Sequence, residues 1–174
     1  CPRRHSLNGD CYVLIHNAPQ SSWKAWYRAG CPKGNTLAAA AACASEAGEH
    51  GVRLGAYGDP AAVPWQVWES FLTEIGRING SRPNHTGYSH QWRATLFAGP
   101  NAYGQLVWCR HNLMASVDSP REAVLARAAG WRYFLAVPEA LADQIPARTV
   151  ECLSVREGST MTCKECRICD GSQG

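Results

Sequence analysis

The chain has 174 residues, of which 45% are hydrophobic and 18% charged, and its formal net charge is +3 at pH 7. This balance is typical of a globular domain, and it excludes an intrinsically disordered chain. The basic residues are scattered and lack the dense stripe of a dedicated nucleic-acid binder. No run of about 18 apolar residues is present, so we expect no membrane span. An odd count of nine cysteines and no recognisable signal segment favour the reducing cytoplasm over a secreted, disulfide-bonded class.

Residues 1–35 form a loop-rich, cysteine-containing N-terminal segment. A short strand is expected over residues 12–15, and Ser21-Ser22 predicts the N-cap of a helix over residues 23–29. Two cysteines of this segment, Cys1 and Cys11, are candidate metal ligands, either as a second centre with Cys31 or as additions to a centre at the C-terminus. Ordinary buried thiols are the alternative.

The next part of the chain predicts a helix, a strand and a second helix. The alanine-rich residues 36–47 favour a helix that ends at Gly48, with Cys43 as a small core residue. Residues 52–57 alternate as a strand does and run into a Gly-Asp-Pro turn. A helix then begins near Pro64 and extends to residue 75, and its expected apolar face consists of Trp65, Trp68, Leu72 and Ile75.

The second half of the chain repeats this alternation. Strands are expected over residues 86–92, 113–117 and 131–137, with a loop around residues 99–104. A helix is expected over residues 121–129, with Val124, Leu125 and Ala128 facing inward. Alternating strands and helices favour parallel pairing through right-handed crossovers. We therefore predict a single α/β domain over residues 1–174, built on a small, mostly parallel sheet or a partial barrel with flanking helices.

Polar side chains follow three of the predicted strands at the point where each strand ends. In a parallel sheet these ends open onto one face, which is where ligands bind in α/β proteins. The candidates for acid–base catalysis or anion binding are Asp59, His90, Arg93 and Asp118, and those for contact with a ligand are Tyr57, Trp92 and Ser119. The competing interpretation makes Asp59 and Asp118 turn or N-cap residues, His90 an ordinary hydrogen-bonded residue, and Arg93 a side chain stacked on Trp92.

The C-terminal segment, residues 151–174, is rich in cysteine. Cys152 is followed after ten residues by Cys163, Cys166 and Cys169 at C-x2-C-x2-C spacing. This spacing lets three sulfurs converge from one tight loop, and Cys152 can supply a fourth. Clustered thiolates select zinc or an iron–sulfur cluster, and the triple run favours a 4Fe–4S cluster, with zinc as the alternative. Disulfides are the third interpretation, although the three close cysteines cannot pair comfortably with one another.

Several of these motifs together resemble the gene product 88-like family of bacteriophage and bacterial proteins. The resemblance covers most of the chain in the same order. The motifs that carry it are Cys1-Pro2 with Cys11-Tyr12, Val52 through Gly58-Asp59-Pro60, Tyr88–Arg93, Ser116-Val117-Asp118, and Cys152 with the terminal cysteine run. Where family members often carry Cys-Pro, this chain has Cys152-Leu153. The resemblance implies a phage or prophage origin, and thus the host cell cytoplasm, together with a metal site, but it implies no particular reaction.

The sequence therefore favours a phage-type iron–sulfur protein with a polar cleft at the strand ends, in which a small molecule or a nucleic acid would be the ligand. A zinc-stapled, non-enzymatic protein that binds nucleic acid or a host or virion protein is the first alternative. A disulfide-bonded virion component is the second.

Overall fold

The structure is a computed structural model that describes residues 18–30, 33–56, 58–93, 99–153, 156–166, 168 and 169. The expectations for Cys1, Cys11, Cys31 and Tyr57, and for a strand over residues 12–15, lie outside these residues. The chain divides into two compact units, Cys1–Asn35 and Thr36–Gly174. In the described part of the chain, no helix combines the length and the apolar character that crossing a lipid bilayer requires.

The first unit contains helix α1 (Ala18–Arg28). The helix begins before the predicted cap at Ser21-Ser22, so that expectation was wrong. Its aromatic residues are exposed, and Trp23 and Tyr27 stack on each other one turn apart, with ring centroids 5.3 Å apart.

The second unit is built on four parallel strands in the order β1-β2-β3-β4: β1 (Val52–Leu54), β2 (His85–Ser89), β3 (Met114–Val117) and β4 (Tyr133–Leu135). The register pairs Arg53 with Thr86, Tyr88 with Met114, and Ser116 with Phe134. The prediction of an α/β fold with a small parallel sheet and flanking helices is confirmed.

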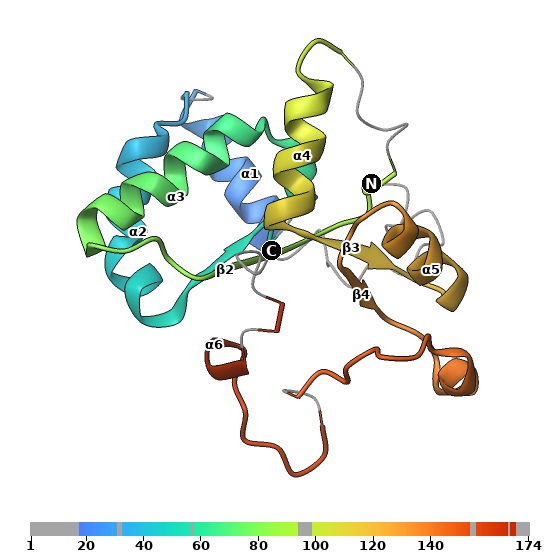
Figure 1. Ribbon diagram of the computed structural model, residues 1–174. Coiled ribbons are helices and arrows are strands. Elements are labelled where there is room, and N and C mark those ends of the chain that lie inside the picture. The colour runs from blue at the N-terminus through green and yellow to red at the C-terminus, as the bar shows by residue number, and fades with distance from the viewer. Residues whose placement is uncertain are drawn as a thin grey trace. The chain divides into compact units, whose positions relative to one another are not determined.

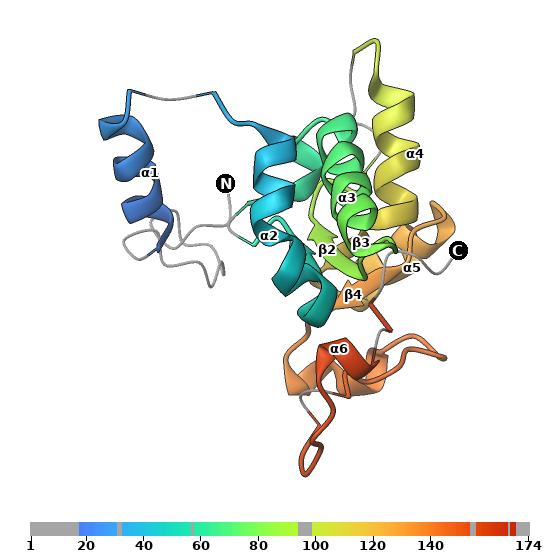
Figure 2. The ribbon, with the colours of Figure 1, turned by 90° about the vertical axis from the view of Figure 1, so that its left-hand side faces the viewer.

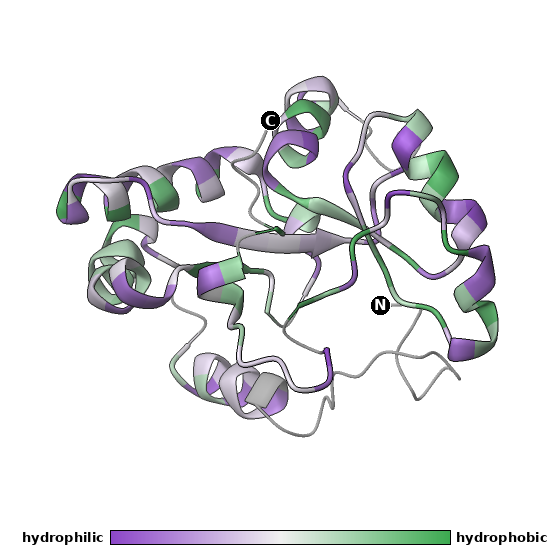
Figure 3. Ribbon diagram, turned by 60° about the horizontal axis from the view of Figure 1, so that its bottom comes forward, coloured by the Kyte–Doolittle hydropathy of each residue, from purple (hydrophilic) through white to green (hydrophobic). Residues whose placement is uncertain are grey.

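Each pair of neighbouring strands is joined through a helix: α3 (Trp65–Asn79), α4 (Ala102–Asn112) and α5 (Pro120–Ala128). Helix α2 (Thr36–His50) precedes β1, and α3 lies between α2 and α4 (Figure 1, Figure 2). Hydrophobic and hydrophilic residues are mixed along the helices (Figure 3).

The main hydrophobic core lies between the sheet and these crossover helices. Its buried residues include Leu54, Leu72, Leu113, Val117 and Trp131, and a smaller cluster of Ala40, Ala47 and Ile75 joins α2 to α3. Gly87 belongs to the helix-covered face of β2, because a Cβ there would lie 2.6 Å from Leu113 and 3.2 Å from Leu54. Since side chains alternate along a strand, Tyr88 points to the opposite face.

The C-terminal segment follows a 3₁₀ helix, η4 (Glu139–Gln144), and contains one helical turn, α6 (Cys163–Cys166). In both views it lies on the other side of the sheet from α3 and α4 (Figure 1, Figure 2). Parallel sheets are usually covered on both faces. Here the helices cover one face, and the cysteine-rich segment approaches the other.

Three predicted boundaries in the first half of the second unit were wrong, one of them the end of α3, which lies at Asn79 and not at Ile75. Helix α2 continues through Gly48 to His50, and Gly51 (φ 75°) ends it. Gly48 is accommodated because the Asn79 side chain packs against it, and Asn79 Nδ2 donates to the Ala44 carbonyl at 2.6 Å. Strand β1 stops at Leu54 because Gly55 adopts φ 69° and turns the chain.

In the second half, residues 102–104 of the loop expected around residues 99–104 are the first turn of α4, whereas residues 99–101 form the bend and turn that precede it. Gly104 lies inside this helix, and a Cβ there would be 3.2 Å from Trp65 Nε1, so the glycine permits close packing of α4 on α3. Val124 and Leu125, which were expected to face inward, are 58% and 50% exposed. Ala128 is exposed as well, because the small residues Ala123 and Ala126 face the sheet instead. Cys43, expected in the core, is exposed.

Candidate functional site

The carboxyl ends of β1, β2 and β3 bring three of the predicted site residues together. Asp59 follows β1 and caps the 3₁₀ helix η2 (Pro60–Ala62), since its Oδ1 accepts from the Ala61 N–H at 3.0 Å. Its other oxygen, Oδ2, accepts from the backbone N–H of His90 at 2.9 Å. Asp59 is therefore a cap, as the competing interpretation held, and it also ties the end of β2 to the end of β1.

His90 and Asp118 form the second contact of this edge. His90 Nε2 lies 3.8 Å from Asp118 Oδ1, and the two side chains are 48% and 37% exposed. A histidine beside a carboxylate, both open to solvent at the carboxyl edge of a parallel sheet, is an arrangement that can transfer protons to and from a ligand.

Arg93 is held by neighbours on both sides. Its guanidinium lies over the Trp92 ring, with Cζ 4.4 Å from the centroid, and forms an ion pair with Glu122. Glu122 also accepts from the backbone N–H of Asp118 at 3.0 Å. The charge of Arg93 is thus compensated by a carboxylate within the protein, which weakens the expectation that Arg93 holds an anionic ligand.

Two residues that were expected to contact a ligand instead stabilise the fold. Trp92 is buried in the main hydrophobic core. Ser119 is the N-cap of α5, and its Oγ accepts from the Glu122 N–H at 3.2 Å. The sequence analysis missed Glu122, although the spacing Ser119-x-x-Glu122 is that of a capping box and could have indicated a carboxylate at this edge.

The loop that carries Asp59 is fixed from behind by α3 and α4. The Gln105 side-chain amide donates to the carbonyls of Ala61 and Val63, at 3.1 and 2.9 Å, and its oxygen accepts from the Trp65 N–H at 2.8 Å. Trp68 Nε1 donates to the Pro60 carbonyl at 2.8 Å. The Asp59 carboxylate is therefore presented by a loop with satisfied backbone groups.

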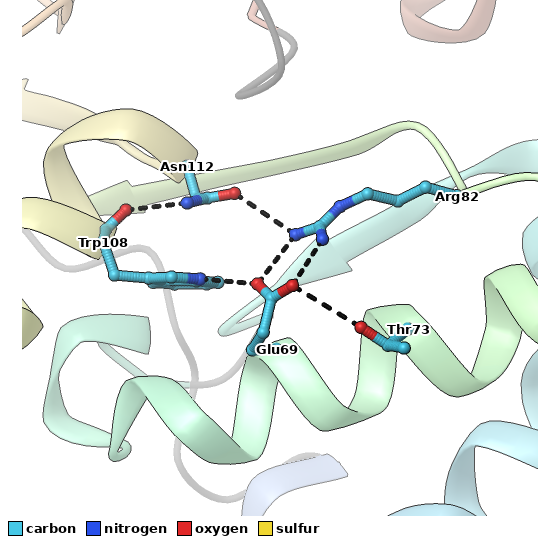
Figure 4. Close-up of polar contacts among 5 residues, drawn as sticks. All are labelled: Glu69, Thr73, Arg82, Trp108 and Asn112. Carbon is cyan, nitrogen blue, oxygen red and sulfur yellow. Dashed lines mark hydrogen bonds and ion pairs between the residues drawn. The ribbon is translucent and has the colours of Figure 1, made fainter.

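A second polar network holds α3, α4 and the segment before β2 together (Figure 4). Both oxygens of Glu69 accept from Arg82, at 2.6 and 3.0 Å, and one also accepts from Trp108 Nε1 at 2.8 Å. Thr73 donates weakly to Glu69, and Arg82 reaches Asn112 at 3.4 Å. The Arg82 hydrogen bonds, opposed by partial burial and supported by Trp108, lower the pKa of Glu69 to about 2.

The four cysteines of the C-terminal segment are present as thiols, with no disulfide among them. Cys163 and Cys166 lie on one helical turn, because Thr162 caps it in a capping box. Glu165 Oε2 accepts from the Thr162 N–H at 2.9 Å, and the Glu165 N–H lies 3.4 Å from Thr162 Oγ1. Residues three apart on a helix face the same side, so this turn presents two sulfurs together.

Cys169 connects this segment to the sheet. Its sulfur lies near the Tyr88 hydroxyl. Burial raises the pKa of Cys169, the Tyr88 hydroxyl opposes this, and the charges of Cys152, Cys166 and Cys163 raise the pKa further. The other three cysteines of the segment are therefore close enough to act on Cys169. Burial also raises the pKa of Tyr88, to about 12.

As they stand, the donor groups do not close around a single ion. Among the side chains in the described ranges, no three of His, Cys, Asp or Glu are arranged to hold a metal. The chemistry of the donor set fits a soft metal, since it consists of four thiols crowded together.

Comparison of this chain with protein-family models, with curated proteins and with solved structures gives no match.

Proposed function

We propose that the protein is a phage-type iron–sulfur protein in which Cys152, Cys163, Cys166 and Cys169 hold a 4Fe–4S cluster beside an acid–base pair at the carboxyl edge of the sheet. The observation that carries the proposal is the gathering of four cysteines at the sheet: Cys152, Cys166 and Cys163 all lie near enough to Cys169 to raise its pKa, and Cys169 lies near Tyr88. Tyr88 is the penultimate residue of β2, and His90 is the first residue after that strand. The cysteine segment therefore reaches the sheet only two residues from the His90–Asp118 pair.

The crowding of the thiols supports a cation in this position. The negative charges of Cys152, Cys166 and Cys163 make ionisation of Cys169 harder, because like charges repel. A bound metal centre reverses this effect, since it stabilises all of its thiolate ligands at once. Without a metal, four thiols within 18 residues would be prone to oxidation.

The open arrangement of the sulfurs is compatible with the proposal. Most of the segment from residue 156 to residue 165 is exposed, so little packing opposes a movement of Cys163 and Cys166 toward Cys152 and Cys169. A metal site rarely exists before its segment folds, so the free energy of metal binding can order the segment that carries the ligands. The cluster would then be structural or electron-carrying.

At the strand ends, His90 would act as the acid–base group and Asp118 would orient its imidazole. Asp59 would fix the backbone of His90 rather than contact a ligand. A small molecule bound at this edge would lie between the His90–Asp118 pair and the cysteine segment.

Anaerobic purification with iron, zinc and acid-labile sulfide analysis tests the proposal. We expect about four iron and four sulfide per wild-type chain and a brown protein. Cys169→Ser should lose most of the iron, whereas Cys43→Ser, which changes an exposed cysteine on α2, should keep it. Far-UV circular dichroism of both variants checks that the fold is retained.

Two results would contradict the proposal in different ways. A wild-type chain with neither iron nor zinc would remove the metal centre altogether. One zinc per chain, without sulfide, would replace the iron–sulfur assignment by the zinc-stapled alternative.

A further inference from the structure

Helix α1 of the first unit carries a stripe of exposed aromatic side chains. Trp23, Trp26 and Tyr27 are 57%, 45% and 62% exposed, although tryptophan is highly buried on average. Residues three and four apart on a helix are neighbours, so the three rings lie on one face of α1. Neighbouring exposed apolar side chains of this size are typical of an interaction site.

The two rings at the centre of this aromatic stripe are arranged as a flat surface. Trp23 and Tyr27 stack with their ring centroids 5.3 Å apart and with 16° between the ring planes. More than half of each side chain is exposed, so the pair presents aromatic surface to solvent. A nucleobase can stack on such a surface whatever its identity, because every base has a π-face.

Two basic residues run beside the aromatic stripe. Lys24 and Arg28 each follow one ring of the stacked pair in the sequence, which places them about 100° further around the helix. They lie one turn apart, and Arg28 Nε donates to the Lys24 carbonyl at 3.2 Å. The sequence of α1 contains no Asp or Glu, so the helix has a net positive charge that complements a polyanion.

The composition of α1 favours a nucleic acid over a membrane surface as the partner. Amphipathic helices that enter a membrane interface bury Leu and Phe together with Trp. The 11 residues of α1 include no Leu, Ile, Val or Phe, and the aromatic stripe consists of Trp and Tyr, whose rings carry polar groups. Flat rings beside cations are what proteins use to bind single strands without sequence preference.

We propose that α1 binds single-stranded nucleic acid, with bases stacked on Trp23 and Tyr27 and with Lys24 and Arg28 paired to phosphates. The proposal is independent of the metal centre and of the His90–Asp118 pair. Because the basic residues of the rest of the chain are scattered, stacking contributes most of the affinity and the dependence on salt is modest.

Fluorescence anisotropy of a short labelled oligothymidylate, titrated with the full chain, tests the proposal. We expect the single strand to bind more tightly than a duplex of the same length, whose bases are already stacked on one another. Trp23→Ala and Tyr27→Ala should each weaken binding about fivefold or more. Tyr27→Phe keeps the ring and should bind as the wild type does. Tyr103→Ala, which removes an exposed ring from α4, is the matched control and should also bind normally.

A second pair of variants tests the contribution of charge. Lys24→Gln combined with Arg28→Gln should reduce the slope of log Kd against log salt concentration by about 1.4, because each phosphate contact on a single strand contributes about 0.7. Arg121→Gln combined with Arg127→Gln changes two exposed arginines of α5 and should leave the slope unchanged. Far-UV circular dichroism checks that every variant keeps its helices.

The proposal is overturned if the wild-type chain does not bind the oligonucleotide, if the duplex binds equally well, or if Trp23→Ala and Tyr27→Ala keep wild-type affinity. Binding to vesicles that contain phosphatidylserine, without binding to the oligonucleotide, would assign the aromatic stripe to a membrane surface instead. A dimer that Trp23→Ala dissociates, again without oligonucleotide binding, would assign it to a second copy of the chain. None of these results depends on metal content, so they are distinguishable from failure of the proposed function.

Discussion

Glu69 offers the most direct test of how the helices that support the site are held. Its carboxylate on α3 accepts hydrogen bonds from Arg82 and from Trp108 of α4. Replacement by glutamine keeps the size of the side chain and removes its charge. Because Arg82 loses its counter-charge, Glu69→Gln should destabilise the contact between α3, α4 and the segment that leads into β2.

The magnitude follows from the pKa of Glu69, which is lowered from 4.5 to about 2. At about 1.36 kcal/mol per pH unit, this lowering corresponds to about 3.4 kcal/mol. The side chains of Glu69 and Arg82 are 35% and 40% exposed, so solvent screens the pair and reduces the effect. We therefore expect Glu69→Gln to lower the free energy of unfolding at pH 7 by about 1–2 kcal/mol, or Tm by roughly 2–8 °C.

The pH dependence has a definite sign. Because the pKa of Glu69 is lower in the folded than in the unfolded protein, its contribution is fully present above pH 4.5 and is lost as pH falls toward 2. Urea denaturation of wild type and Glu69→Gln between pH 7 and pH 2 should show a difference that shrinks below pH 4.5.

Glu74→Gln is the matched control for this experiment. Glu74 lies on the same helix and, within the described ranges, pairs only with Arg77 one turn away, whose side chain is 69% exposed. Its replacement should change stability less than that of Glu69. Curves for wild type and Glu69→Gln that stay parallel over the whole pH range would refute the assignment of the network to the Glu69 charge.

Two further predictions concern the sheet and its edge. Gly87→Ala should lower the free energy of unfolding, measured by urea denaturation, by roughly 1–3 kcal/mol, because the added Cβ would lie 2.6 Å from Leu113. Gly34→Ala is the control and should be nearly neutral, since its Cβ meets nothing within 4 Å. Equal stabilities of the two variants would mean that Leu113 moves aside without loss of stability. Asp59→Ala should lower the free energy of unfolding by about 1–2 kcal/mol and shift the backbone amide resonance of His90, because the N–H groups of Ala61 and His90 lose their acceptor. An unchanged resonance would show that the Asp59–His90 hydrogen bond is not formed in solution.

The parallel sheet could be predicted from the sequence because its elements obey local rules. Alternating apolar residues indicated the strands, and the helices α3 and α5 each carried a cap or a periodic apolar face. Helix α4 escaped this reasoning because Gly104 is a turn signal by local chemistry alone. Its reason for being there is tertiary: it lets the helix approach Trp65. The same limit applies to α5, where Ala123 and Ala126 face the sheet although Val124 and Leu125 are more hydrophobic. Close packing of a helix on a strand favours small side chains at the contact, which hydrophobicity alone does not indicate.

The candidate site divides along similar lines. That Asp59, His90 and Asp118 meet could be predicted, since parallel strands end at one edge. The atoms that pair could not be predicted, because the partners of the His90 backbone and of the Glu122 carboxylate depend on the path of the loops after the strands. The ion pair between Arg93 and Glu122 is the clearest example. The position of Arg93 in the sequence indicated an anion-binding residue, but Glu122 in the first turn of α5 supplies its counter-charge.

The approach of the cysteine segment to Tyr88 is explained by the need to cover the second face of the sheet. A parallel sheet is stable when both faces are covered. The crossover helices cover the face of Leu54 and Val117, and on the other face the half-buried Tyr88 and Phe134 need a cover as well. The segment after residue 150 has few large apolar residues, and Val150 and Met161 are exposed, so hydrophobic burial alone holds it weakly. On the proposed function, metal ligation supplies what this segment lacks in apolar surface, as it does in small domains that fold only with their metal. Removal of the metal should then leave the core of helices and strands folded, release the cysteine segment to proteolysis, and expose Tyr88 to solvent.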